Sequence, residues 1–203
     1  MRLFLEKSIA IGLLIMLSNG AFAQASEPEL SDEIKEYFKK SILTRVKRLE
    51  HYISIIANKS MDDNLRKSSI DQAVQLFEDE NRIVQISSFK NGIETLTERP
   101  VRVYFDRLYA IKADRVDITF YKVTQLTDIR LGPDNKYYAT AYIFQDTKIY
   151  YTSASEIPDY SDVTEKAIDI TIKPDTTVIG DKTIVLYPAK LGNINVKETR
   201  SQQ

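Results

Sequence analysis

Cysteine is absent from this 203-residue chain, and histidine occurs only once, as His51. The lack of cysteine excludes a disulfide framework, a thiol nucleophile and the lipid-bearing N-terminal cysteine of bacterial lipoproteins. One histidine without cysteine also leaves too few of the usual ligands for a zinc site. The sequence has no G-x-S-x-G turn to support a Ser-His-Asp triad, and no phosphate-binding loop. We therefore expect neither a metal nor another cofactor.

The chain also lacks an excess of positive charge. Its 28 lysines and arginines stand against 29 acidic residues, which gives a net charge of −1. Proteins that bind nucleic acid are normally basic, so we expect no nucleic-acid partner. Beyond the N-terminal region, no apolar stretch reaches the ~20 residues of a membrane-spanning helix. This predicts that the mature protein has no membrane span.

The first 23 residues follow the pattern of a secretory signal. Arg2 and Lys7 precede an apolar segment over residues 9–17, and the tripeptide Ala-Phe-Ala ends at Ala23. We expect cleavage after Ala23, a flexible lead over residues 24–30, and a periplasmic or secreted protein of the Gram-negative envelope. A membrane anchor is the alternative, but the apolar segment has roughly half of the ~20 residues that a spanning helix needs.

A long first helix is predicted from Ser31 to about Asn58. Ser31 is a suitable N-cap, and Asp32 and Glu33 suit the positive end of a helix. Apolar residues then recur in steps of three and four, the period of one helical face. These residues are Ile34, Phe38, Ile42, Val46, Leu49, Ile53 and Ile56.

A second helix is expected after Ser60, because Ser60 and Asp63 have the spacing of a capping box. The stretch Asp62-Asp63-Asn64 is interpreted as part of this cap and not as a calcium site, since it lacks the EF-hand spacing and glycine. The residues expected in the core from this segment are Leu65, Ile70, Val74 and Phe77.

The middle of the chain predicts a strand, a turn, a short helix and a bent strand. The strand covers residues 83–88, and Asn91-Gly92 marks the turn. Pro100 suits the first turn of a short helix. Val116, Ile118 and Phe120 then alternate as in a strand. The alternation breaks between Phe120 and Val123, which predicts a β-bulge that bends the strand.

Further strands are predicted in the C-terminal half. A turn over residues 132–135 precedes a strand over 137–151, which we expect to form a hairpin with the bent strand. Another strand covers 161–173, and Gly180-Asp181 turns into a last pair over 183–187 and 193–198. Helices that come first and strands that follow predict an α+β fold with helices on one face of a curved, mainly antiparallel sheet. We expect a single domain over residues 31–200.

This order of elements resembles the NTF2-like (nuclear transport factor 2-like, cystatin-type α+β) superfamily, in particular its secreted members from Bacteroidetes. The matching stretches cover roughly Ser60 to Lys173: AVQLFEDENRIVQISS, RPVRVYFDRLYAI, DRVDITFYKVTQL, YYATAYIFQD and DVTEKAIDITIKP. The resemblance implies a cone-shaped pocket between the sheet and the helices, and dimerisation through the open sheet face. Some members are isomerases or dehydratases and many only bind or assemble, so the resemblance alone does not choose a function.

Two aspartates and four tyrosines are the candidate site residues. Asp106 and Asp117 would serve as general bases if buried, because burial raises the pKa of a carboxyl group; a solvated face or a salt bridge is the alternative. Tyrosine rings suit the lining of a pocket for sugars, steroids or peptides, although they also pack on sheets simply as strand formers. The tyrosines considered are Tyr104, Tyr121, Tyr138 and Tyr142.

Two further residues carry weaker signals. His51 flanks the apolar stripe of the first helix, where a surface or interfacial position explains it better than a titrating functional group. Asp175-Thr176-Thr177 resembles the acceptor of periplasmic O-glycosylation in Bacteroidetes, with Thr176 as the modified residue. A turn after Pro174 explains the same residues.

The absences above favour a non-enzymatic binding or interaction protein that takes a small molecule or an envelope protein, and the resemblance implies that it forms a homodimer. One alternative is an acid/base isomerase or hydro-lyase that uses Asp106 or Asp117 with a tyrosine. Another is a purely structural or assembly module whose cone is filled by side chains.

Overall fold

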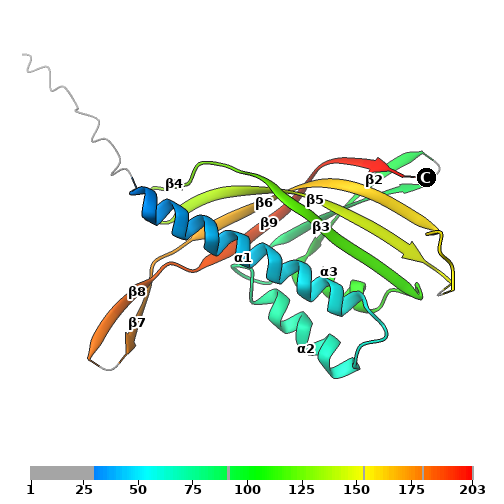
Figure 1. Ribbon diagram of the computed structural model, residues 1–203, viewed down its shortest axis with the longest axis horizontal. Helices are drawn as coiled ribbons and strands as arrows, with labels where there is room; N and C mark the ends of the chain where they lie inside the picture. Colours follow the sequence, from blue (N-terminus) through cyan, green and yellow to red (C-terminus); the bar gives the residue numbers. More distant parts are fainter. Residues whose placement is uncertain (1–29, 91, 153, 180, 203) are drawn as a thin grey trace, which may run out of the picture.

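The computed structural model describes residues 30–90, 92–152, 154–179 and 181–202. The predicted secretory signal, and nearly all of the flexible lead, lie outside these residues. Within them, the helices lie together on one side of a curved, mostly antiparallel sheet, as Figure 1 shows. The predicted α+β class is therefore confirmed. None of the helices described is both long enough and apolar enough to cross a membrane.

The first helix, α1 (Asp32–Ala57), has the predicted bounds and cap. The Ser31 hydroxyl accepts a hydrogen bond from the Ile34 amide at 3.4 Å. The apolar stripe faces the sheet and is buried, apart from Ile34 in the first turn, which is exposed. On this side of the sheet, the Glu50 carboxylate accepts a hydrogen bond from the Phe120 amide at 2.8 Å, next to the bend of the facing strand.

The second helix, α2 (Asp63–Val74), begins differently from the prediction. Asp62 is its N-cap and accepts a hydrogen bond from the Leu65 amide at 3.0 Å, so the capping box from Ser60 is wrong. Ser60 instead donates to the Asn58 side chain at 2.7 Å. Leu65 is exposed, whereas its neighbour Arg66 is buried. Of the other residues expected in the core, Ile70 and Phe77 are buried and Val74 is half-buried, so the predicted face is confirmed except at Leu65.

Arg66 has a structural role at the ends of two other helices. Its Nε and Nη2 atoms donate to the Ile56 carbonyl at 3.0 and 2.8 Å, and Nη2 also donates to the Tyr109 carbonyl at 2.9 Å. The last carbonyls of a helix have no partner within the helix. Arg66 satisfies two of them, at the end of α1 and at the end of α3 (Val101–Tyr109).

The main sheet has the strand order β2-β1-β9-β6-β5-β3, with the short β4 beside β5. Neighbouring strands are antiparallel except β1 and β9, which are parallel and paired only at Val84 and Ile194. The strands are β1 (Ile83–Lys90), β2 (Ile93–Pro100), β3 (Arg115–Leu126), β4 (Arg130–Leu131), β5 (Tyr137–Tyr150), β6 (Tyr160–Ile172) and β9 (Ala189–Ser201).

The strand predictions are confirmed in part. The register between β3 and β5 shifts at Tyr121/Val123 and again at Val123/Gln125, so the predicted bulge is present. The predicted last pair is wrong: β8 (Lys182–Leu186) pairs with β7 (Asp175–Ile179) in a separate hairpin, and β9 joins the main sheet between β6 and β1. This hairpin projects away from the sheet (Figure 1).

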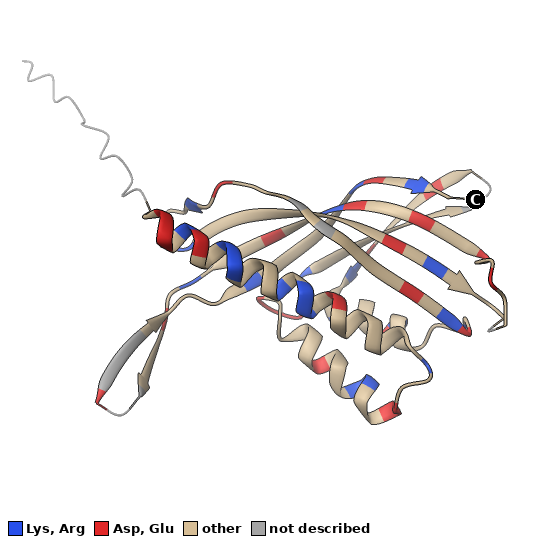
Figure 2. Cartoon of the chain, viewed as in Figure 1, with Lys and Arg blue, Asp and Glu red and all other residues tan. Residues whose placement is uncertain are grey.

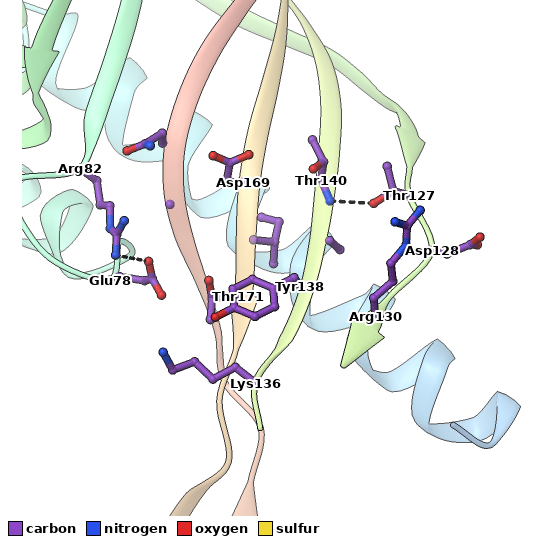
Figure 3. A pocket seen from close by; sticks show the side chains of 14 residues that line it. Glu78, Arg82, Thr127, Asp128, Arg130, Lys136, Tyr138, Thr140, Asp169 and Thr171 are labelled. Atoms are coloured by element: carbon purple, nitrogen blue, oxygen red, sulfur yellow. Dashed lines mark hydrogen bonds and ion pairs between the residues drawn. The ribbon is translucent and has the colours of Figure 1, made fainter. Parts of the chain in front are cut away.

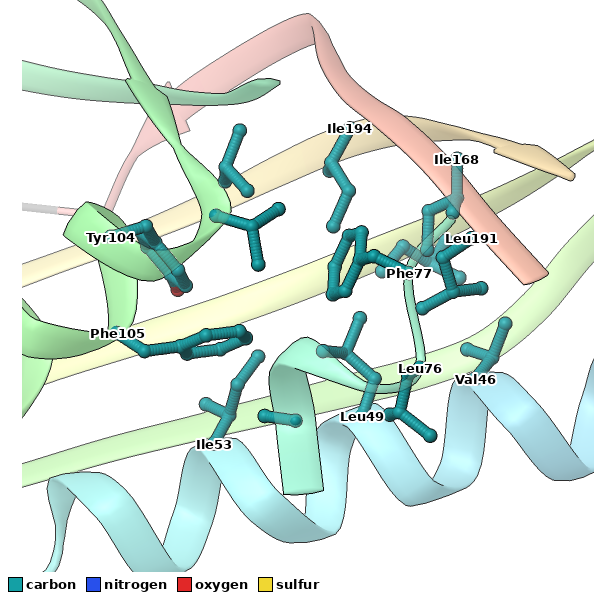
Figure 4. Close-up of a cluster of buried hydrophobic side chains, with 14 of the residues drawn as sticks. Val46, Leu49, Ile53, Leu76, Phe77, Tyr104, Phe105, Ile168, Leu191 and Ile194 are labelled. Atoms are coloured by element: carbon teal, nitrogen blue, oxygen red, sulfur yellow. The ribbon is translucent and has the colours of Figure 1, made fainter. Parts of the chain in front are cut away.

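The core lies between the helices and the sheet face toward them, which we call the inner face. Along β6 the inner side chains of the C-terminal half are Ile168, Ile170 and Ile172, and all three are buried. Figure 4 shows Phe77 at the centre of this layer, between Ile194 and Leu49. Figure 2 shows positive and negative residues interspersed over the helices and strands, in keeping with the near-neutral net charge.

Candidate functional site

A cavity of about 440 Å³ opens on the inner face of the sheet, between α3 and strands β1, β3, β5 and β6. We call it the β6 pocket, because β6 supplies its polar groups. Most of its wall is apolar. The apolar side chains are Tyr104, Leu108 and Ile111 from α3 and the segment after it, Val116 and Ile118 from β3, Ile149 from β5, and Ile86 and Phe89 from β1. Burial raises the pKa of Tyr104 to about 12, so its hydroxyl stays neutral.

The polar end of the pocket is a row of side chains on one face of β6. Tyr160, Asp162, Thr164 and Lys166 occupy alternate positions, so all four point to the inner face. The Tyr160 hydroxyl donates to Asp162 Oδ2 at 2.5 Å, and the Thr164 hydroxyl donates to Asp162 Oδ1 at 3.1 Å. Both carboxylate oxygens of Asp162 therefore accept hydrogen bonds from neighbours on the same strand.

One wall of the pocket is β1, which pairs with β9 at a single position. Beyond Val84 no register pair joins β1 to β9, and the Gln85 side-chain carbonyl accepts a hydrogen bond from the Val196 amide at 2.9 Å. The Gln85 backbone carbonyl accepts one from Lys166 Nζ at 3.3 Å, and the Phe89 amide donates to the Tyr160 hydroxyl at 3.3 Å. The strand β1 thus lies against the polar row of β6, whose members Asp162, Thr164 and Lys166 are buried.

Burial governs the ionisation of the charged groups in this pocket. It lowers the pKa of the Lys166 amine to about 8, and the nearby Asp162 carboxylate opposes this shift only in part. Burial also raises the pKa of Asp162, against the hydrogen bonds from Tyr160 and Thr164 and the charge of Lys166. The low-dielectric surroundings disfavour both charges. The pocket therefore holds two titratable groups whose pKa values burial shifts toward each other.

The mouth of the pocket carries exposed side chains. Arg107 on α3 and Tyr151 after β5 both line it and are exposed to solvent. A ligand could therefore enter past a cation and an aromatic ring, and reach the row of hydrogen-bonding groups on β6. Pockets that bind small molecules combine a mostly apolar wall with a few placed polar groups in this way.

A second cavity, of about 500 Å³, lies on the opposite face of the sheet and is lined mostly by charged and polar groups. Figure 3 shows Arg82 and Glu78 on one side, and Arg130 on the other side of Asp169. Arg82 and Glu78 form an ion pair at 2.6 Å. Burial raises the pKa of Asp169. We call this the outer pocket; several of its charges are already paired with neighbours, which leaves less for a ligand to bind.

The two aspartates predicted as general bases do not line the β6 pocket. Asp106 is exposed on α3. Asp117 is exposed on β3, with its carboxylate 3.3 Å from Arg115 Nε, and it lies in a separate polar hollow near Lys148. The solvated face and the salt bridge considered as alternatives describe these two residues.

The four candidate tyrosines do not gather around one cavity. Tyr104 lines the β6 pocket, and Tyr138 lines the outer pocket. Tyr121 is exposed on β3, and its hydroxyl donates to Asp146 at 2.9 Å. Tyr142 is not among the residues that line either of these two cavities, and strand alternation puts it on the same side of β5 as Tyr138. Of the four candidates, only Tyr104 lines the β6 pocket, and a ligand-binding role of any of them stays a prediction.

The remaining candidates lie at the surface. His51 is exposed on α1, with its ring 5.8 Å from that of Tyr52, as expected for a surface residue. Thr176 is exposed within β7, so the turn expected after Pro174 is wrong, and its glycosylation stays a prediction. Among the described residues, no group of three or more histidine, cysteine or acidic side chains is placed to hold a metal ion.

Sequence reasoning missed Tyr160, Asp162 and Lys166, although a signal for them was present. The predicted strand over residues 161–173 places Ile168, Ile170 and Ile172 on the core side. Counting back in steps of two from Ile168 puts Lys166, Thr164 and Asp162 on that same side. The alternation alone therefore predicts buried charges in this strand.

Comparison with known proteins supplies no relative for this chain: no family model, no curated protein and no solved structure matches it.

Proposed function

We propose that the protein binds a small molecule in the β6 pocket, with the apolar body of the ligand against α3 and β3 and its polar end at β6. One observation carries the proposal: an apolar cavity of about 440 Å³ ends in the hydrogen-bonding row that includes Asp162 and Lys166. Ligand cavities commonly measure roughly 300–1,000 Å³. The volume therefore suits a ligand of ordinary metabolite size.

We also propose an NTF2-like arrangement, in which the β6 pocket corresponds to the cone. The bulged strand β3, the helices on one face of the sheet and a pocket beside α3 support this. A crystal structure in which side chains fill the β6 pocket would contradict it, and would favour the purely structural role instead.

Filling the pocket should weaken binding without unfolding the protein. Thr147 lies on the inner side of β5 and lines the pocket. We expect Thr147→Phe to weaken binding of the apolar fluorescent probe N-phenyl-1-naphthylamine by roughly tenfold or more, since each tenfold change corresponds to about 1.4 kcal/mol. The measurement is a fluorescence titration of the full chain.

The matched control is the same substitution on the same strand but on the opposite face. Thr140 lines the outer pocket, so Thr140→Phe should leave the affinity for the probe unchanged. Circular dichroism of both variants checks that they are folded. Equal affinity of Thr147→Phe and the unaltered protein, or an equal loss in both variants, would contradict binding in the β6 pocket.

Acid/base catalysis in the same pocket is a second candidate function. The observation that favours it is the Asp162 carboxyl group, whose pKa burial raises and which accepts a hydrogen bond from the Tyr160 hydroxyl. A carboxylate with a raised pKa is a stronger general base near neutral pH. In this function Asp162 would remove a proton from the ligand and Tyr160 would stabilise the resulting negative charge.

Proton removal can be measured without knowing the substrate. A cyclic ketone is incubated with the protein in deuterated water, and exchange of the hydrogens next to its carbonyl is followed by NMR. Catalysed exchange that is lost in Asp162→Asn but kept in Asp117→Asn supports this function, because Asp117 lies outside the pocket. Exchange no faster than in buffer, or equally fast with Asp162→Asn, removes it.

A further inference from the structure

We propose that Lys166 binds the ligand of the β6 pocket covalently and reversibly, as an imine with an aldehyde or ketone group. This inference rests on the proposed function and names the class of its ligand: a largely apolar carbonyl compound. Imine formation requires an amine that faces the cavity, that has no strong ion pair or short hydrogen bond, and that lies near an acidic group. The structure provides each of these.

The Lys166 amine is placed for such a reaction. Its side chain lines the β6 pocket and is only 3% exposed. Within the described part of the chain, Nζ donates a single hydrogen bond, to the Gln85 carbonyl, and at 3.3 Å this bond is long. An ammonium group has three hydrogens to donate. A ligand can therefore approach the nitrogen without breaking a strong ion pair.

The surroundings favour the neutral, nucleophilic form of the amine. A lysine in an apolar site loses its proton more readily, and such lysines form Schiff bases with carbonyl compounds. Burial lowers the pKa of Lys166 to about 8 here. Asp162, on the same strand, is the acidic group whose charge acts on Lys166, and the other titratable or charged side chains of the pocket are Tyr104, Arg107, Tyr151 and Tyr160.

The chemistry needs no additional reagent. The nitrogen lone pair of neutral Lys166 forms a bond to the carbonyl carbon, and the carbonyl π electrons move to oxygen. A proton passes from nitrogen to that oxygen, which gives a carbinolamine. The proton that the Asp162 carboxylate takes up from the Lys166 ammonium group then passes to the hydroxyl group, water leaves, and the nitrogen lone pair forms the C=N bond. The products are a protonated imine, water and the Asp162 carboxylate; water reverses every step.

Reductive trapping identifies the reacting lysine. The full chain is incubated at pH 7.5 with 2-naphthaldehyde and sodium cyanoborohydride, which reduces the imine to a stable secondary amine. Digestion and mass spectrometry then locate the label. We expect Lys166 to carry roughly tenfold more label than any exposed lysine, since an ordinary lysine with a pKa near 10.4 is almost entirely protonated. Label spread evenly over exposed lysines, or missing from Lys166, overturns the proposal.

Lys190 is the matched control within the same sample. Burial also lowers its pKa, but it is not among the residues that line the pocket, and its Nζ donates to the Gln75 carbonyl at 2.8 Å. Little label on Lys190 is expected if the pocket matters. Equal labelling of Lys190 and Lys166 shows that a lowered pKa suffices, and contradicts the role of the pocket. Lys166→Arg keeps the positive charge and should lose the label.

The outcome also separates this inference from the proposed function. N-phenyl-1-naphthylamine has no carbonyl group, so its binding tests the pocket without the imine. Binding of this probe together with an unlabelled Lys166 overturns the covalent step alone. Loss of both probe binding and labelling overturns the ligand-binding function as well.

Discussion

Replacing Lys166 by methionine is expected to raise the free energy of unfolding at pH 7 by up to about 3 kcal/mol. In the folded protein, burial lowers the pKa of this amine from 10.5 to about 8. The charged amine therefore destabilises the folded state at neutral pH. Methionine has a similar length and no charge, so it removes this cost while filling much of the same space.

The pH dependence gives the sign of the effect. Between pH 8 and 10.5 the unfolded chain still binds the Lys166 proton and the folded protein does not. The free energy of unfolding must then increase with pH in this window. Below pH 8 both states hold the proton, so the cost is constant. We expect Lys166→Met to lack this increase when urea unfolding is measured from pH 7 to 10.5.

Lys148→Met is the control for this experiment. Asp146 raises the pKa of Lys148 through a hydrogen bond, so its shift has the opposite sign. This variant should keep the increase that Lys166 causes. Because tyrosines also titrate near pH 10, the comparison uses the difference between each variant and the unaltered protein. A difference for Lys166→Met that stays constant across the window would contradict the burial of a lowered-pKa amine.

Phe77→Ala is expected to lower the free energy of unfolding by about 4 kcal/mol, as in other truncations of buried aromatic residues. Phe77 is 2% exposed, and its ring centroid lies 6.2 Å from that of Phe105. The segment around it also docks on β9, where the Glu78 amide donates to the Leu191 carbonyl at 2.9 Å. Truncation leaves a cavity at the junction of helices and sheet. Urea unfolding measures the loss.

Leu65→Ala provides the comparison, because the sequence pattern places both residues in the core. Leu65 is 45% exposed in the structure. Its truncation should cost less than about 1 kcal/mol, as is usual for surface substitutions. Equal costs for the two variants would show that Leu65 is buried in the core, and would contradict its exposure on α2.

Sequence patterns predict the elements that depend on interactions within one segment of the chain. The stripe of α1 and the bulge of β3 both follow from the spacing of apolar residues within one segment. The strand β2 was missed because most of its residues are exposed. A strand without a buried face shows no alternation of apolar and polar residues in its sequence. The pairing of β9 was also missed, since strand patterns do not say which strands become neighbours.

The site was harder to predict because it combines several segments that are far apart in the sequence. Asp162 and Lys166 were not among the candidate residues, since charged side chains in a strand usually face solvent. Their position on the same side of the strand as Ile168 indicates burial, but the pocket in front of them also needs the walls that β1, α3 and β3 supply. The placement of these walls depends on contacts between segments far apart in the chain.

An NMR titration with N-phenyl-1-naphthylamine tests the central claim most directly, because it locates the bound probe. Isoleucine methyl signals report on several parts of the core. If the β6 pocket binds the probe, the signals of Ile118 and Ile149, which line it, shift on titration. The signal of Ile42, which is a buried residue of α1 and does not line the pocket, stays in place. Shifts elsewhere with none at Ile118 or Ile149 would contradict the account.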